Sequence, residues 1–264
     1  MNQKTPGLNA IERGHGRELL LIHGLGGSWR SWSPILDGLA ASRKVIAIDL
    51  PGHGDTPIQG DSVTFRGLTE SVERHLDEAG LKGIDVAGSS MGARMVLELA
   101  RRGVVGNVVA LDPGGFWEGW ERAFFKTTIG LSGRLLRAIR PSLRAVSRSA
   151  ALRTALLAQL SAKPWALDPD LVANELIGLA QTTTFDALVR DLATGPAQEG
   201  LKGDTGRRIV IGWGRQDRLC LPRQAKRAAA AFPSAQLHWF DDCGHFPMWD
   251  LPRETTEVIL SATQ

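Results

Sequence analysis

One five-residue stretch, 88–92, limits what this chain can fold into. Its sequence, Gly-Ser-Ser-Met-Gly, lies between a β-branched apolar run at 84–87 and a helix-compatible stretch at 93–102. This order predicts a strand, a very tight turn and a helix. The two glycines let the strand and helix backbones approach, so the residue between them stands on a strained, outward turn. The spacing therefore predicts that Ser90, and not its neighbour Ser89, is a nucleophile.

Expected strands and expected helices alternate along most of the chain. The expected strands cover residues 8–12, 18–22, 44–50, 84–87, 104–111, 208–213 and 236–240. The expected helices cover residues 32–41, 65–79, 93–102, 222–232 and 252–261. This alternation predicts an α/β fold, with a mostly parallel sheet of about seven strands joined by right-handed crossovers.

The alternation is interrupted between residues 116 and 196. This stretch favours helix and contains no expected strand, and three prolines divide it into short helices: Pro141, Pro164 and Pro169. We interpret it as a helical cap inserted between two parts of one core, 1–115 and 197–264. An insertion at this point lies above the carboxyl ends of the strands. We therefore expect the cap to select the substrate without supplying a catalytic side chain.

Two later turns carry a base and an acid suited to activating a serine. A serine hydroxyl attacks only when a base removes its proton and a carboxylate fixes the tautomer of that base. His245 follows the last expected strand on a glycine-flanked loop, and Asp217 follows the preceding strand at the same edge of the sheet. Asp112, which ends the strand after the nucleophile helix, is the alternative acid. We expect His23 and His53, which lie in glycine turns, to bond the backbone.

A glycine-rich loop at 23–27 follows the second expected strand. It lacks the Lys-Ser/Thr ending of a P-loop and the G-x-G-x-x-G spacing of a dinucleotide site, so it is better suited to aiming a backbone N–H group. Cys220 and Cys243 are far apart in the sequence and do not have the spacing of metal ligands, so we interpret them as small core or loop residues. We expect neither a cofactor nor a metal ion.

Taken together, these motifs make the chain resemble an α/β-hydrolase-fold serine hydrolase. The resemblance covers nearly the whole chain, through the stretches 23–27, 49–54, 88–92, 214–217 and 244–245 in the order Ser, Asp, His. It implies that Ser90 is the nucleophile, His245 the base and then the acid, and Asp217 the residue that orients His245. It also implies an oxyanion hole formed by the backbone N–H groups of Leu25 and Met91.

The sequence departs from the pattern of this family in two places. Only about twenty residues precede the glycine loop, so we expect the first edge strand of the family to be missing and seven strands in place of eight. Ala93 follows Gly92 where many relatives have another glycine, and alanine is small enough for the helix to pack there. The family includes dehalogenases and epoxide hydrolases with an aspartate nucleophile, and Ser90 argues against both activities.

Eight tryptophans and no tyrosine suggest a pocket for an apolar or aromatic ester group. The tryptophans beside loops of the predicted active face are the candidates to line it: Trp29, Trp117, Trp120, Trp165 and Trp249. Core packing is the preferred interpretation for the other three, Trp32, Trp213 and Trp239. The expected partner is therefore a small molecule, and the oligomeric state is not predicted.

Composition excludes several other classes of protein. The 264 residues are 43% hydrophobic with a net charge of +3, and they lack the aromatic-basic motifs of nucleic-acid modules. No apolar run approaches the roughly 20 residues that span a bilayer, and the first residues lack the apolar core of a signal peptide, so we expect a cytoplasmic protein.

Between 122 and 163 there are basic residues and no acidic ones, with Arg134, Arg137, Arg144 and Arg148 at helical spacing. We interpret this stripe as a solvated face, with capture of an anionic substrate or contact with a membrane surface as alternatives.

Three functions fit these motifs. The leading hypothesis is hydrolysis of carboxylic esters through an acyl-enzyme on Ser90. A second is cleavage of a C–C bond in a vinylogous keto acid, because Gly114-Gly115 and Trp249 resemble that subgroup, although Ser89 stands where the subgroup often has Asn. A third is a ligand receptor that keeps the triad but turns over slowly. Turnover of aryl esters would separate the first function from the third.

Overall fold

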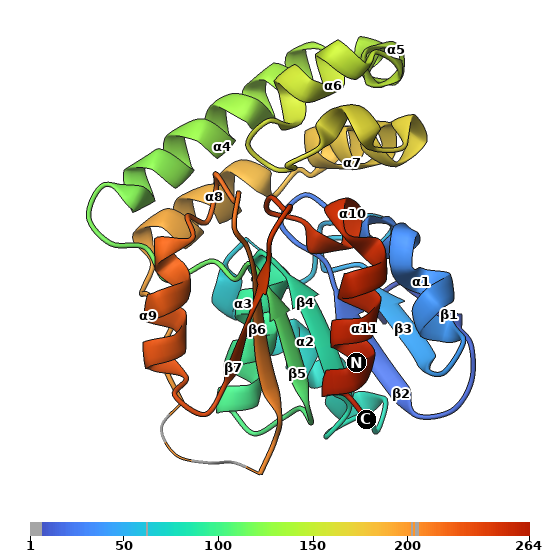
Figure 1. Cartoon of the computed structure of the whole chain (residues 1–264), viewed down its shortest axis with the longest axis vertical. Helices are drawn as coiled ribbons and strands as arrows, with labels where there is room; N and C mark the ends of the chain where they lie inside the picture. The colour runs from blue at the N-terminus through green and yellow to red at the C-terminus, as the bar shows by residue number, and fades with distance from the viewer. Residues whose placement is uncertain (1–6, 62, 202, 204–205) are drawn as a thin grey trace.

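The structure is a computed structural model that describes residues 7–61, 63–201, 203 and 206–264. The prediction about the absence of a signal-peptide core concerns residues 1–6, which lie outside the described residues. The described chain forms a central sheet with helices on both faces, and a further layer of helices lies above one edge of the sheet (Figure 1). None of the helices in this part of the chain has the length and apolarity that crossing a bilayer requires.

The sheet has seven strands in the described residues, as predicted. They are β1 (Ala10–Arg13), β2 (Glu18–Ile22), β3 (Lys44–Ile48), β4 (Asp85–Ser89), β5 (Val108–Leu111), β6 (Ile209–Gly214) and β7 (Gln236–Phe240). Their order across the sheet is β1-β3-β2-β4-β5-β6-β7. Only β1 pairs antiparallel, with β3, and every other pairing is parallel. The carboxyl ends of six strands therefore meet at one edge.

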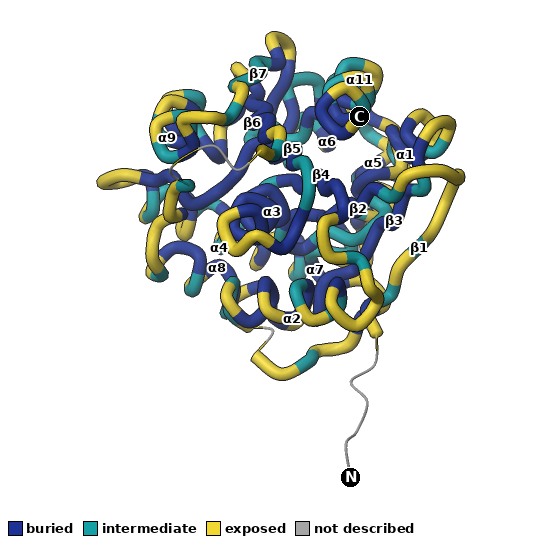
Figure 2. The backbone as a smooth tube through the Cα atoms, turned by 90° about the horizontal axis from the view of Figure 1, so that it is seen from below, coloured by how far each residue is buried: buried dark blue, intermediate teal, exposed yellow. Residues whose placement is uncertain are grey.

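Successive side chains of the strands from β2 to β7 enter two different hydrophobic clusters, as the pleat requires. One cluster packs the strands against α2 (Phe65–Glu78), α3 (Met91–Arg101) and α9 (Arg223–Ala231). The other packs them against α1 (Ser33–Ala40) and α11 (Pro252–Ala262). Viewed from below, α3 and the strands β2, β4 and β5 are drawn as mostly buried, whereas β1 is exposed at the edge of the molecule (Figure 2). The helix after the nucleophile turn is thus fixed on all sides.

The stretch between β5 and β6 is helical and contains no strand in its described residues. Its elements are α4 (Glu121–Ala138), η2 (Arg140–Ser142), α5 (Leu143–Arg148), α6 (Ala150–Leu157), η3 (Pro164–Ala166), α7 (Pro169–Gln181) and α8 (Phe185–Thr194). We refer to α4 to α8 as the upper helices, because Figure 1 shows them above the strand ends. They share both hydrophobic clusters with the sheet region.

Several element boundaries differ from the predicted ones. The strand predicted at 104–111 begins only at Val108, because Gly103 has φ +76° and Val104 N–H bonds back to Leu99 O to close α3. The helix predicted from residue 93 begins at Met91, and the preceding strand extends to Ser89, so the turn is tighter than predicted. Two short helices were not predicted, η1 (Trp29–Trp32) and α10 (Pro247–Asp250).

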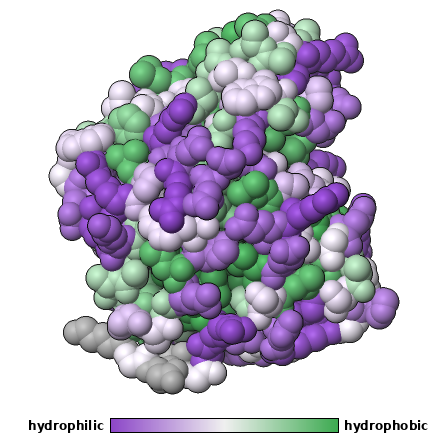
Figure 3. Space-filling model, viewed as in Figure 1, coloured by the Kyte–Doolittle hydropathy of each residue, from purple (hydrophilic) through white to green (hydrophobic). Residues whose placement is uncertain are grey.

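The arginine stripe of the upper helices is mostly exposed. Arg134, Arg144 and Arg148 face solvent, while Arg137 pairs with Asp186 at 2.9 Å. Exposed apolar side chains lie on the same helices, with Leu131 57% and Leu135 49% exposed. Figure 3 shows hydrophobic and hydrophilic residues mixed over this upper layer. The upper layer therefore presents no purely basic surface in this view.

Candidate active site

The turn between β4 and α3 holds Ser90 in a strained backbone conformation. Its φ is +56° and its ψ is −112°, a region that costs free energy for any residue with a side chain. The flanking glycines are required by close contacts: a Cβ on Gly88 would lie 2.3 Å from Gly92 O, and one on Gly92 would lie 2.2 Å from Ile22 O. The sequence folds this way locally because no other residue fits these two positions.

Three side chains from separate turns meet at the carboxyl edge of the sheet. His245 Nε2 lies 2.8 Å from Ser90 Oγ, and His245 Nδ1 lies 2.8 Å from Asp217 Oδ2. His245 and Asp217 are almost fully buried, whereas Ser90 is only partly buried. The ring therefore bridges a hydroxyl and a carboxylate, which is the geometry needed to transfer a proton from serine.

The second carboxylate oxygen of Asp217 fixes its own turn. Asp217 Oδ1 accepts hydrogen bonds from Leu219 N–H at 2.7 Å and from Cys220 N–H at 3.0 Å. Because one oxygen is held by the backbone, the other is aimed at the imidazole. The turn after β6 thus orients the acid before any substrate arrives.

Asp112, the alternative acid, makes no hydrogen bond with His245 among those of the described residues. It is fully buried with φ +48°, and its Oδ1 accepts the Gly214 N–H at 2.8 Å. Burial, and then the charge of Asp217, raises the pKa of the Asp112 carboxyl well above its usual range. Asp112 therefore lies beside Asp217 and holds the end of β6.

The glycine loop after β2 approaches Ser90 closely. A Cβ on Gly24 would lie 3.1 Å from Ser90 Cβ and 3.7 Å from Ser90 Oγ. The backbone N–H groups of Leu25 and Met91 donate no hydrogen bond to any of the described residues. Asp49 fixes the residues that directly follow the loop, because its Oδ1 accepts the Trp29 N–H at 2.7 Å. Sequence reasoning missed this role of Asp49.

His23 and His53 bond the backbone, and burial keeps both neutral. His23 Nε2 accepts the Leu50 N–H at 3.0 Å, so its Nδ1 donates to Gly24 O at 2.7 Å. Burial lowers the pKa of His23 to about 4. Burial, with a contribution from the charge of His23, lowers the pKa of His53 to about 3. These two histidines therefore support the loop as neutral rings.

The upper layer holds the His245 loop through backbone groups. His245 N–H donates to Leu160 O at 2.8 Å. The Asp250 carboxylate accepts N–H groups from Gly244 at 2.7 Å and from Ala162 at 2.8 Å, so it ties this loop to the segment after α6. No motif in the sequence marks Asp250, because its partners lie 6 and 88 residues away.

A small cavity of about 40 Å³ lies against the glycine loop. Its walls come from the glycine loop, η1, α6 and the residues after it, α7, and the region around α10. The lining residues are Gly24, Leu25, Gly26, Gly27, Ser31, Leu157, Leu160, Glu175, Leu176, Leu179, Phe246 and Trp249. Trp249 is thus the one predicted pocket tryptophan in this wall, and its Nε1–H donates to Ser31 O at 3.0 Å.

The other predicted pocket tryptophans do not line this cavity. Trp120 and Trp165 are 58% and 55% exposed, and Trp117 is buried against Phe125. Trp29 is half-buried beneath Arg30.

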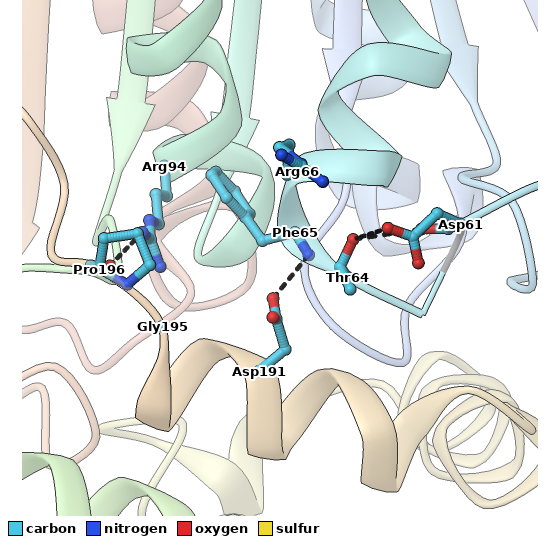
Figure 4. Close-up of a pocket in the computed structure, with 8 residues that line it drawn as sticks. All are labelled: Asp61, Thr64, Phe65, Arg66, Arg94, Asp191, Gly195 and Pro196. Atoms are coloured by element: carbon cyan, nitrogen blue, oxygen red, sulfur yellow. Dashed lines mark hydrogen bonds between the residues drawn. The ribbon is translucent and has the colours of Figure 1, made fainter.

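A larger cavity of about 320 Å³ lies between the starts of α2 and α3 and the end of α8 (Figure 4). It is lined by Asp61, Thr64, Phe65, Arg66, Arg94, Asp191, Gly195 and Pro196. The polar groups there already bond one another: Phe65 N–H donates to Asp191 and Arg94 donates to Pro196 O, both at 2.8 Å. None of Ser90, Asp217 and His245 lines it.

Asp217, Cys220 and His245 present possible metal-ligand atoms within 4.8 Å of one another. Burial raises the pKa of the Cys220 thiol well above its usual range, and metal ions bind the thiolate. The oxygens of Asp217 and both nitrogens of His245 already have hydrogen-bond partners. Asp217 and His245 are therefore better suited to proton transfer with Ser90 than to metal binding with Cys220.

Comparison with known proteins shows the family of the chain. The model of the alpha/beta hydrolase family matches residues 19–258. The chain is 30% identical over 203 residues to the epoxide hydrolase EphH of Mycobacterium tuberculosis, covering 74% of this chain and 92% of that protein. It is 26% identical to a 2-hydroxy-6-oxononadienedioate/2-hydroxy-6-oxononatrienedioate hydrolase of Cupriavidus pinatubonensis, covering 96% of this chain and 89% of that protein.

Other relatives are longer. The chain is 31% identical to the dihydrolipoyllysine-residue acetyltransferase component of the acetoin cleaving system of Cupriavidus necator, covering 94% of this chain and 64% of that protein. The chain therefore spans less than two thirds of that relative. Among solved structures, an esterase from Thermogutta terrifontis matches with a TM-score of 0.74 at 18% identity, covering 96% of this chain and 92% of that one. This likeness concerns the fold.

Proposed function

Because this chain belongs to the α/β-hydrolase family, we propose that it is a serine hydrolase acting on carboxylic esters that carry an apolar or aromatic group. The observation that carries the proposal is the pair of 2.8 Å contacts that join Ser90, His245 and Asp217. The walls of the adjacent cavity, mostly leucine and aromatic side chains, support an apolar substrate group.

In this mechanism His245 Nε2 removes the Ser90 proton as Oγ attacks the ester carbonyl carbon. The N–H groups of Leu25 and Met91, which lack acceptors among the described residues, would stabilise the negative oxygen of the tetrahedral intermediate. His245 then gives the proton to the departing alcohol, which leaves an acyl-Ser90 ester. Water, deprotonated by His245, attacks this ester, and His245 then returns that proton to Ser90 Oγ as the C–O bond to Ser90 breaks and the carboxylic acid leaves. Asp217 holds the ring in the required tautomer throughout.

The stretch 116–196 serves as a cap in this proposal. It supplies the α6 and α7 side of the cavity and holds the His245 loop through Leu160, but it gives no side chain to the proton-transfer chain. It therefore governs which substrate group fits and how well water is excluded.

An alkyl fluorophosphonate tests the proposal, because it reacts with an activated serine. We expect a single adduct on Ser90 and none in Ser90→Ala, with turnover of 2-naphthyl acetate lost in the same variant. Mass spectrometry locates the adduct. An adduct on Ser89, or turnover that persists in Ser90→Ala, would overturn the assignment. Very slow turnover by a labelled protein would favour a ligand receptor.

Cleavage of a C–C bond is the second candidate. It is favoured by the relative from Cupriavidus pinatubonensis, a hydrolase of dienoic and trienoic keto acids that aligns with 96% of this chain. Product analysis with a vinylogous keto acid separates the two reactions. Release of a carboxylic acid from that substrate, faster than from aryl esters, would favour this second function.

A further inference from the structure

The cavity beside the glycine loop has one ionisable side chain in its wall, Glu175 on α7. The side chain is partly buried, and its Oε2 accepts a hydrogen bond from Ser31 Oγ at 2.7 Å. The other walls are glycine backbone and apolar or aromatic side chains, apart from Ser31 itself. Neither the sequence motifs nor the proposed reaction gives this carboxylate a task.

Glu175 belongs to the substrate side of the site because α7 packs directly on the glycine loop. A Cβ on Gly26 would lie 2.9 Å from Leu179 Cγ, and Leu179 is one helical turn after Glu175. The same loop touches Ser90 through Gly24. Glu175 and Ser90 therefore both lie close to the same short loop, residues 23–27.

The charge of Glu175 has no partner of opposite sign in contact with it. Among the described residues it forms no salt bridge, and the cation that acts on it, Arg30, pairs with Asp55 at 3.8 Å and lies over the Trp29 ring. Burial is the main cause that raises the pKa of Glu175 to about 7, with Asp49 raising it further and Ser31 and Arg30 lowering it. A cation placed in the cavity would hold the carboxyl in its ionised form.

We propose that Glu175 is a specificity-determining residue that binds an ammonium group of the substrate in this cavity. The inference rests on the proposed function, since it narrows the substrate class of that same site: esters whose apolar group ends, inside the cavity, in a primary amine. Two aromatic side chains, Phe246 and Trp249, also line the cavity, and their ring centroids lie 4.2 Å apart. Aromatic rings near a cation attract it electrostatically. A volume of about 40 Å³ suits one small cationic head.

Direct binding of n-butylammonium, compared with neutral n-butanol, tests the proposal without any catalysis. By calorimetry at pH 8 we expect the ammonium ion to bind the whole protein at least about 10-fold more tightly than the alcohol. Glu175→Gln keeps the size and the acceptor for Ser31 but removes the charge, so it should abolish this preference. Asp170→Asn, an equal charge change at an exposed position of the same helix, should leave it intact. Equal affinity of Glu175→Gln and the unaltered protein for butylammonium would overturn the proposal.

The pH dependence of butylammonium binding gives a test that needs no variant. A carboxyl with a pKa of about 7 is mostly ionised at pH 8 and mostly neutral at pH 6. The affinity for butylammonium should therefore fall about 10-fold over this range as the pH decreases. Continuing the series to pH 4 includes the ordinary pKa of a glutamate carboxyl, and an affinity that does not change down to that pH would overturn the proposal.

Protection of Ser90 from a fluorophosphonate locates the ion at the proposed site. Butylammonium should slow the labelling of Ser90 in the unaltered protein and in Asp170→Asn, but not in Glu175→Gln. Binding without protection would place the ion elsewhere and overturn the proposal. If Ser90 is not labelled under any condition, the proposed hydrolase function fails, whereas the binding measurements still decide the role of Glu175.

Discussion

The carboxyl edge of the sheet and the upper helices border the same cavity, but they are built differently. At the edge, backbone geometry fixes the residues: Ser90 has φ +56°, and Gly88 and Gly92 leave no room for a Cβ. The upper helices contribute α6 and α7 side chains to the cavity and leave Leu131 and Leu135 exposed elsewhere.

Because of this difference, substitutions in the two regions should have different effects. At the edge a substitution should remove the chemistry, because buried groups such as Asp217 and His245 are held in one geometry by their hydrogen bonds. In the upper helices a substitution should change which substrate is preferred, because the side chains there surround the cavity without joining the proton-transfer chain. The predictions below test this separation, starting with the largest expected effect.

Ser90→Ala should lower kcat by about 10⁴-fold or more, because nucleophile and base act as one unit. Ser89→Ala is the matched control, since the Ser89 hydroxyl is buried and has no hydrogen-bond partner among the described residues. We expect its kcat to stay within about 3-fold of the unaltered protein, as no bond is lost. Steady-state kinetics with 2-naphthyl acetate measures both. A larger loss in Ser89→Ala would contradict the assignment of the nucleophile.

Asp217→Asn should lower kcat by about 10³- to 10⁴-fold, because the amide can no longer hold His245 in the required tautomer. Asp112→Asn should cost less than about 10-fold, since the amide oxygen of asparagine can still accept the Gly214 N–H. Circular dichroism checks that both variants fold. If Asp112→Asn is the more damaging of the two, the acid has been placed after the wrong strand.

The edge should also be sensitive to acid, because His53 is buried as a neutral ring. Its pKa of about 3 in the folded protein lies below the ordinary value of 6.5, so the unfolded chain binds more protons between these pH values. Stability is therefore lost as the pH falls from 6.5 towards 3, by about 3 kcal/mol or more from this residue. Denaturant unfolding at several pH values measures the slope. His53→Asn should flatten it, whereas His15→Asn, at an exposed turn, should not.

Trp249→Phe should change substrate preference by about 1–2 kcal/mol, since Trp249 lines the cavity and its N–H holds Ser31 O. The measured quantity is the ratio of kcat/KM between 2-naphthyl isobutyrate and 2-naphthyl acetate. Trp120→Ala should leave this ratio unchanged, because its side chain is 58% exposed and does not line the cavity. A shift in Trp120→Ala alone would restore the pocket role that the sequence suggests for Trp120.

The sequence by itself determined the fold, because its signals are local. A glycine-bracketed serine between a strand and a helix, together with alternating strands and helices, needs only neighbouring residues to be interpreted. Most predicted elements agree with the observed ones within a few residues. The predicted and observed bounds differ at Val104, which favours a strand by its side chain but closes the end of α3 through its N–H.

Only the tertiary structure decided which side chains meet. Ser90 and His245 are 155 residues apart, and the choice of Asp217 over Asp112 as the partner of His245 depends on which turn reaches the ring. Glu175 and Ser31 are 144 residues apart, and no local pattern distinguishes Glu175 from a solvated helix residue. Contacts of this range follow from how helices pack on the sheet, and that packing depends on the shapes of many side chains at once.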